Sequence, residues 1–141
     1  MNDTDEFRRL LSRHPFPVCA ELTPFTILDA DLDTGRVRME FEAQPAFGNH
    51  FDAIQGGFAV AMLDAVVTLA AFAAVRDWLP TVEIKASFLE PLPIGACVGE
   101  GQVVKCGRQI VFVEGRLLKD GAAAVVASAT LVRRAAGKPG T

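Results

Sequence analysis

Asp64 and Thr68 are the residues whose type and spacing most directly suggest chemistry. From Gly57 to Val75 they are the only polar side chains among Gly, Ala, Val, Leu, Phe and Met. Burying a carboxylate among apolar side chains is unfavourable, so Asp64 needs a hydrogen-bonding partner or a function. In a helix the two residues share one face. Such a carboxylate can act as a general base or a nucleophile, although it can also be a core Asp bonded to Thr or backbone.

The segment that carries Asp64, from Gly56 to Val75, is predicted to form one long helix. It is too long for a buried strand, contains no Pro, and is rich in Ala and Leu. A helix that is apolar on every side is enclosed by its own protein or lies in a membrane. A central Asp makes membrane insertion unfavourable by about 2.5–3.5 kcal/mol, so we expect an enclosed helix and no membrane partner.

The entry to this helix, Gln55-Gly56-Gly57, could bind a developing negative charge. The first N–H groups of a helix are unpaired and lie at its positive end, and Gly residues allow close approach. Gly56 and Asp64 are about 12 Å apart along the axis, whereas a reacting carbon must lie about 3 Å from both. Two antiparallel helices related by a two-fold axis would solve this, so we predict an obligate homodimer with shared sites.

Most of the remaining sequence is predicted to be β-structure that encloses this helix. A short amphipathic helix over residues 3–12, capped by Asp3 or Thr4, comes first. Strands are predicted at 25–32, 36–43, 81–89, 96–106, 109–119 and 123–134. The expected fold is α+β, with a curved antiparallel sheet of five to six strands wrapped around the long helix. Residues 1–141 are expected to form one domain, with a core at about 20–134 and a flexible tail at 135–141.

Several apolar strand residues are expected to face away from the helix. They are Val103, Val111, Val113, Leu117, Val125 and Leu131. A second apolar face of the sheet would favour burial against another subunit, which leaves both a homodimer and a homotetramer open.

The composition excludes several classes of function. Half of the residues are hydrophobic, and the net charge of −3 gives no sign of nucleic-acid binding. Cys19, Cys97 and Cys106 fit no metal-ligand spacing, so we expect no metal and reduced thiols. The polar N-terminal segment lacks the apolar stretch of a signal peptide, and we therefore expect a cytoplasmic protein.

The stretch that begins at Asn49 resembles the hotdog superfamily, and within it the acyl-CoA thioesterases of the phenylacetate-degradation (PaaI-like) and 4-hydroxybenzoyl-CoA type. That family has Asn, two residues, Gly, two residues, His-Gly-Gly, and then Asp or Glu in the helix. Asn49, Gly56, Gly57 and Asp64 match this pattern, and Thr68 matches a Ser or Thr common one turn later. The segments TVEIKASFLEPLP, GRQIVFVEGRLLKDG and AAVVASATLV are also similar.

The resemblance covers about residues 20–134, and two positions depart from the family pattern. Gln55 replaces the usual His, and because Gln can donate a hydrogen bond but cannot titrate, an acid–base role is lost there. Asp52 replaces the usual loop Gly. It adds charge close to the site, and we expect it to narrow the pocket or change what it binds.

The resemblance implies hydrolysis of an acyl- or aryl-CoA thioester to the free acid and CoA. Asp64 would be the general base or nucleophile, and N–H groups at Gly56 would form the oxyanion hole. Asn49 would orient water or substrate, and Thr68 would position the carboxylate or the water. Coenzyme A enters as part of the substrate, and no other cofactor is expected.

Five further residues are candidates for substrate binding: Gln55, Gly57, His50, Arg108 and Lys85. Arg108, in a predicted turn, is the first candidate for the phosphates of CoA, with Lys85, Lys105 and Arg133 behind it. Ordinary solvated surface charge is the alternative for each of these cations.

Two other functions fit the same fold. One is a non-catalytic hotdog dimer that binds an acyl or aryl ligand, with Gln55 marking the loss of activity. The other is an enoyl-CoA hydratase or dehydratase, whose sites typically pair a His with a carboxylate. No His lies in the predicted helix, which makes this third function the weakest of the three.

Overall fold

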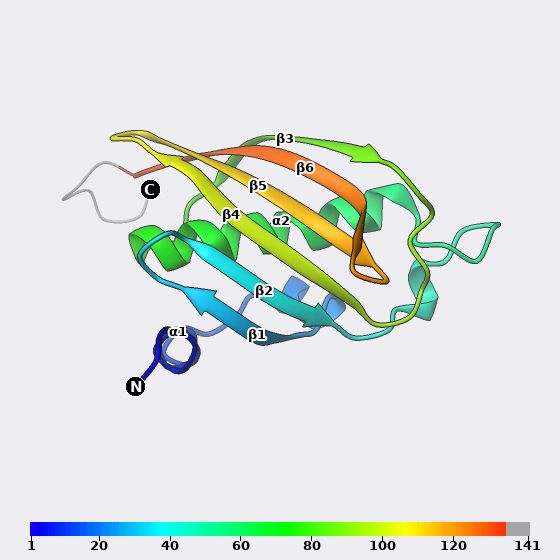
Figure 1. Cartoon of the computed structure of the whole chain (residues 1–141), viewed down its shortest axis with the longest axis horizontal. Coiled ribbons are helices and arrows are strands. Elements are labelled where there is room, and N and C mark those ends of the chain that lie inside the picture. The colour runs from blue at the N-terminus through cyan, green and yellow to red at the C-terminus, as the bar shows by residue number, and fades with distance from the viewer. Residues whose placement is uncertain (135–141) are drawn as a thin grey trace.

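The computed structural model describes residues 1–134 and contains a six-stranded antiparallel sheet curved around one long helix (Figure 1). The strand order is β1-β2-β4-β5-β6-β3. Together with a short N-terminal helix, this arrangement confirms the predicted hotdog fold. The tail predicted at 135–141 lies outside the described residues.

The elements follow the predicted order closely. The strands are β1 (Phe25–Asp31), β2 (Arg36–Phe41), β3 (Thr81–Phe88), β4 (Cys97–Cys106), β5 (Ile110–Lys119) and β6 (Ala122–Val132). The helices are α1 (Asp3–Ser12) and α2 (Gly56–Val75), with short 3-10 helices η1 (Val18–Leu22) and η2 (Pro45–Phe47). The predicted bounds of α2 agree with the structure, because an uninterrupted apolar run between Gly-Gly and a charged exit has clear ends.

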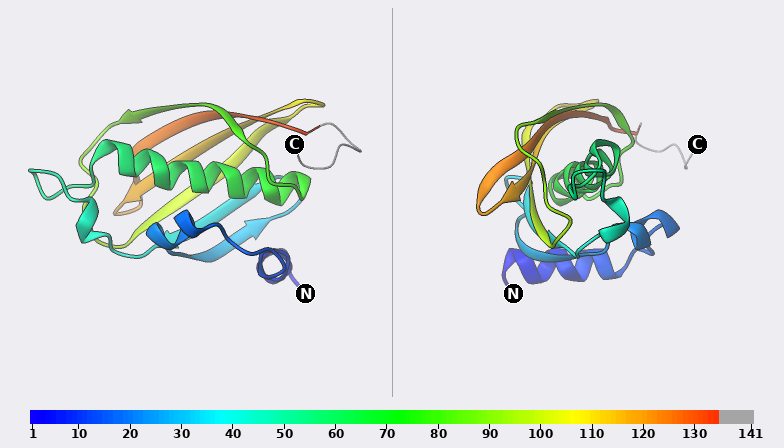
Figure 2. Two further views of the ribbon diagram at one scale, coloured as in Figure 1. Left: turned by 180° about the vertical axis from the view of Figure 1, so that it is seen from behind. Right: turned by 90° about the vertical axis from the view of Figure 1, so that its right-hand side faces the viewer.

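Glycines in the sheet allow α2 to lie close against its concave face (Figure 2). A Cβ atom placed on Gly101 of β4 would lie only 2.8 Å from the backbone oxygen of Val66 and 3.0 Å from the Cβ of Ala70. On Gly115 of β5 it would lie 3.0 Å from a methyl group of Val67. The separation between helix and sheet is therefore set by residues without side chains.

The prediction of which residues face outward from the sheet was wrong. Of the six residues expected to face outward, Val103 is partly buried against the core. The other five are buried inside the fold: Val111, Val113, Leu117, Val125 and Leu131. The polar residues that alternate with them, such as Glu114 and Arg116, lie on the solvated side. The apolar outward residues are instead Val104 and Phe112, which are exposed.

Helix α1 covers one edge of the sheet. Hydrogen bonds join Leu32 N–H to Asp3 Oδ2 (2.8 Å), Ala30 N–H to Thr4 Oγ1 (3.2 Å), and Arg8 Nη2 to the Ile27 carbonyl oxygen (2.7 Å). Three backbone groups along this edge are thereby satisfied, and α1 hinders pairing with another strand there. The cap of α1 is Asn2, whose Oδ1 accepts a hydrogen bond from Asp5 N–H at 2.8 Å, and not Asp3 or Thr4 as predicted.

Strand β3 forms the opposite edge and has no strand on its outer side among residues 1–134. Ile84 and Ala86 are half-buried on the helix side. Val82 is 62% exposed because the register with β6 shifts between Thr81 and Glu83. The β3 edge is therefore open to pairing with another strand.

Helix α2 is long and apolar enough, by length and composition, to cross a membrane. Within the fold, the same apolar composition is explained by the burial of this helix. Its residues between Ala59 and Ala73 supply much of the core, together with the inward side chains of the strands.

Gly101→Ala is expected to lower the free energy of unfolding by about 1–3 kcal/mol, because the new methyl group meets the backbone of α2. Gly95→Ala is the matched control, since a Cβ atom there has no neighbour within 4 Å. Urea unfolding followed by circular dichroism measures both changes. Equal stability of the two variants would contradict the close approach at Gly101.

Candidate functional site

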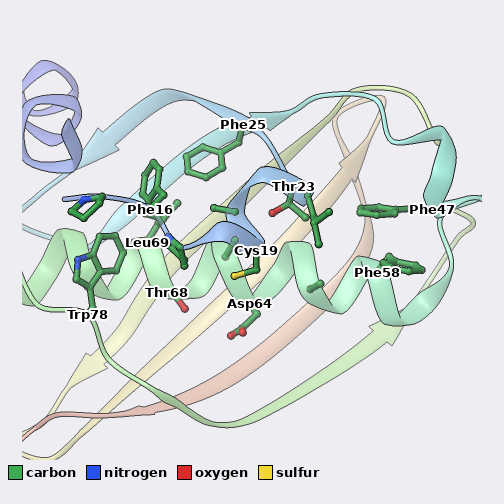
Figure 3. A pocket seen from close by; sticks show the side chains of 16 residues that line it. Phe16, Cys19, Thr23, Phe25, Phe47, Phe58, Asp64, Thr68, Leu69 and Trp78 are labelled. Carbon is green, nitrogen blue, oxygen red and sulfur yellow. The ribbon is translucent and has the colours of Figure 1, made fainter. Parts of the chain in front are cut away.

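An apolar pocket of about 550 Å³ lies between α2 and the segment of residues 15–25 (Figure 3). One wall is a stripe of α2 that the sheet leaves uncovered; its members are Phe58, Ala61, Asp64, Ala65 and Thr68. Phe16 and Trp78 lie at one end of the pocket, and Phe47 and Phe58 lie at the other. The stacked rings of Phe47 and Phe58, 4.3 Å apart, form that second end.

Asp64 is half-buried near the middle of this pocket. Its Oδ1 accepts a hydrogen bond of 2.7 Å from the hydroxyl of Thr81, the first residue of β3. Thr68 lines the pocket beside it, as predicted. Thr81 could not be identified from the sequence, because its contact with Asp64 joins a strand to a helix 17 residues away and has no local sequence pattern.

The first N–H groups of α2 are mostly occupied. Gln55 is the cap: its side-chain Oε1 accepts from Gly57 N–H at 2.9 Å, and its carbonyl oxygen accepts from Phe58 N–H at 2.9 Å. Within residues 1–134, Gly56 N–H makes no hydrogen bond. Gly56 is thus the open donor at this end.

The ring of Phe88, at the end of β3, covers Gly56. A Cβ atom on Gly56 would lie 3.2 Å from the ring, so a side chain fits poorly there. The two ends of β3 therefore contact the two parts of the candidate site, since Thr81 bonds Asp64 and Phe88 lies against Gly56.

Asn49 shapes the loop that precedes α2. Its Oδ1 accepts from Phe51 N–H at 2.8 Å and from Ala53 N–H at 3.2 Å. Asp52 has φ of 57°, a left-handed conformation that favours Gly and that Asp tolerates. His50 and Asp52 are exposed and do not line the pocket, so within one chain Asp52 does not narrow it.

The predicted cations lie away from the pocket within one chain. Arg108 lies in the β4–β5 turn, at the opposite end of the sheet from the loop before α2 (Figure 1). Lys85 lies on β3 and lines a separate hollow of about 270 Å³ with Glu114 and Arg116. The structure thus brings Asp64 and Thr68 together, while Gly56, Gly57, Gln55 and Asn49 lie at the start of α2 and Arg108 and Lys85 lie elsewhere.

Comparison of the chain with sequence models of protein families identifies its family. The sequence model of the thioesterase superfamily matches residues 52–126, more than half of the chain. The chain belongs to the thioesterase superfamily. A search of curated proteins gives no match.

Solved structures agree with the hotdog fold of this superfamily. A phenylacetic acid degradation-related protein from Ralstonia eutropha has 30% identity and a TM-score of 0.81, covering 94% of this chain and 100% of its own. A thioesterase family protein from Silicibacter pomeroyi has 25% identity and a TM-score of 0.74, with coverages of 93% and 97%. Thioesterase superfamily member 2 from Mus musculus has 18% identity and a TM-score of 0.75, with coverages of 94% and 98%, a likeness of fold alone.

The thiols of this superfamily member differ in exposure. Cys19, which lines the pocket, and Cys106 are exposed, whereas Cys97 is buried at the start of β4. Burial raises the pKa of the Cys97 thiol to about 11, and the nearby Glu40 carboxylate adds to the shift. The folded state therefore binds this proton more tightly than the unfolded chain, a stabilisation that is lost as the pH rises from 9.0 through about 11.

A thiol reagent at about pH 8 is expected to modify Cys19 and Cys106 in the folded protein and to leave Cys97 intact, because the thiolate is the reactive form. Mass spectrometry of the intact chain counts the modified thiols. Unfolded protein, in which all three react, is the control. Equal rates for the three thiols in folded protein would contradict the burial of Cys97.

Proposed function

We propose that the protein hydrolyses an acyl- or aryl-CoA thioester in a homodimer with two shared active sites. Membership of the thioesterase superfamily supports thioester hydrolysis as the general reaction. The observation that carries the finer proposal is the Asp64 carboxylate, held by the Thr81 hydroxyl in a largely apolar pocket.

Asp64 supplies the carboxylate chemistry. As a base it takes a proton from water while the oxygen attacks the thioester carbon, and the proton then passes to the departing sulfur of CoA. As a nucleophile it attacks the thioester carbon and expels the CoA thiolate, which takes up a proton from water; water then hydrolyses the resulting mixed anhydride to the free acid and the Asp64 carboxylate. In either case the Thr81 hydroxyl occupies Oδ1 and orients the carboxylate, which makes Thr81 a positioning residue.

The start of α2 supplies the oxyanion site. Gly56 N–H is open, and the positive end of the helix favours the negative oxygen of the tetrahedral intermediate. The side chain of Gln55 adds a second donor: its Oε1 is held by Gly57 N–H, which leaves its NH₂ group for the substrate. Gln55 therefore polarises the thioester without taking up a proton.

The two edges of the sheet support the homodimer. Helix α1 hinders pairing at the β1 edge, whereas the β3 edge is open. Antiparallel pairing of two β3 strands places the Thr81 end of one beside the Phe88 end of the other. Asp64 then faces the partner's Gly56, which supports one shared site at each end. A homotetramer would use a further surface, for which the exposed Val104 and Phe112 are candidates.

One observation favours a second candidate, a dimer that binds an acyl or aryl ligand without hydrolysing it. The Gln55 side chain occupies Gly57 N–H and so removes one donor that a thioester oxygen could otherwise use. Turnover distinguishes this candidate from a thioesterase.

Asp64→Asn is expected to lower kcat by at least about 10²-fold, because the amide can neither accept the proton nor attack the thioester. Thiol release from a panel of aryl- and fatty-acyl-CoA substrates is the measurement. Asp33→Asn is the matched control, since it makes the same chemical change in the exposed turn between β1 and β2. Full activity of Asp64→Asn would overturn the role of this carboxylate, and an inert wild type would favour the ligand-binding dimer.

Mixing Asp64→Asn with Gly56→Val is expected to restore activity if the sites are shared. Val at position 56 collides with Phe88 and blocks the open donor, so each variant alone is expected to be inactive. In a heterodimer one site keeps both native residues, which gives about one quarter of wild-type activity after random exchange. Activity that stays at the level of the separate variants would contradict shared sites.

A further inference from the structure

The loop of residues 49–53 carries an exposed aromatic side chain on a well-bonded support. This loop projects beyond the body of the protein, next to the start of α2 (Figures 1 and 2). Phe51 is 85% exposed, although its own N–H and that of Ala53 bond the Asn49 side chain. Ile54 N–H also bonds the Leu92 carbonyl oxygen at 2.7 Å, which ties the loop to the segment after β3. Covering such a ring is favourable because it removes apolar surface from water.

The pocket has an apolar end that this loop cannot reach within its own chain. That end contains Phe16, Leu69 and Trp78, and Phe16 remains partly exposed there (Figure 3). Helix α2 has 20 residues and is roughly 30 Å long, and the loop lies at the other end of it. Any contact between Phe51 and this end therefore comes from another chain.

The β3-paired homodimer brings the two features together. With the partner's Gly56 beside Asp64 and the two α2 helices antiparallel, the chain that precedes the partner's Gly56 continues past Asp64 toward Thr68 and Trp78. The five residue-to-residue steps from Phe51 to Gly56 span at most about 18 Å. The helix rises only about 8 Å from Asp64 to Leu69, so the loop is long enough to reach.

We propose that Phe51 of each protomer closes the Trp78 end of its partner's pocket. The contact is apolar on both sides, since aromatic and aliphatic side chains line that end. With Phe51 at the Trp78 end, the acyl group occupies the other half of the pocket, between Phe58 and Asp64, which is about 9 Å long along the helix. Phe51 thereby selects compact acyl or aryl groups over long chains, a specificity that rests on the proposed thioesterase function, whereas the contact itself rests on the dimer.

Trp78 provides a direct test, because it is the single Trp of a chain that has no Tyr. Phe51→Ala is expected to shift Trp78 emission to longer wavelength and to increase its quenching by acrylamide. Phe112→Ala, which removes another exposed ring on the outer face of the sheet, is the matched control and is expected to change neither. Unchanged emission of Phe51→Ala, or a protein that is monomeric when measured, would overturn the proposal.

A mixed dimer separates contact between chains from an effect within one chain. Phe51→Ala retains Trp78, and Trp78→Phe retains Phe51, so in a heterodimer the only Trp faces a native Phe51 of its partner. Emission of the exchanged mixture is expected to return part of the way to that of wild type. An emission maximum that stays at the wavelength of Phe51→Ala alone would overturn the proposal.

Kinetics test the selectivity. Phe51→Ala is expected to raise kcat/KM for long-chain acyl-CoA about tenfold relative to a short-chain or aryl substrate. An unchanged ratio would overturn the selectivity. Failure of one proposal can be distinguished from failure of the other. A shift of Trp78 emission in a protein that hydrolyses no thioester supports the Phe51 contact and contradicts the thioesterase proposal. Hydrolysis without a shift of Trp78 emission supports the thioesterase proposal and contradicts the contact.

Discussion

The close contact between α2 and the glycines of β4 and β5 is the constraint on which the rest of the structure depends. With a Cβ atom at Gly101 or Gly115 the helix would have to move away from the sheet. Because it lies so close, the sheet encloses most of its circumference and leaves one narrow stripe uncovered. The pocket forms along that stripe, and the only carboxylate of the helix lies in it.

Strand β3 links this packing to the candidate chemistry. Its first residue, Thr81, bonds Asp64, and its last, Phe88, covers Gly56, so one strand holds both parts of the site. The same strand is the open edge of the sheet. Substitutions that alter how β3 lies on β6 are therefore coupled to the carboxylate, to the oxyanion donor and to association at once.

Much of the fold could be predicted from the sequence because it depends on local patterns. The apolar run of α2, the alternation in the strands and the Asp120-Gly121 turn each have a clear signature. Features that depend on contacts across the fold could not be predicted. The bond from Thr81 to Asp64, the cap that Gln55 places on Gly57, and the inward face of β6 became known only from the structure. In β6 both faces carry apolar residues, so alternation alone did not say which faces α2. In β5 the alternation of Glu114 and Arg116 with Val113 and Leu117 was an available signal for the inward side.

Helix α1 has a consequence for the size of any assembly. Side chains of Asp3, Thr4 and Arg8 occupy three backbone groups of one sheet edge. A protein with two open edges can add copies at both ends without limit and grow into a filament. In the proposed dimer, joining two chains through β3 would leave only α1-covered edges on the outside, and growth by strand addition would stop after a single step. The N-terminal helix would thus limit the continuous sheet to two chains.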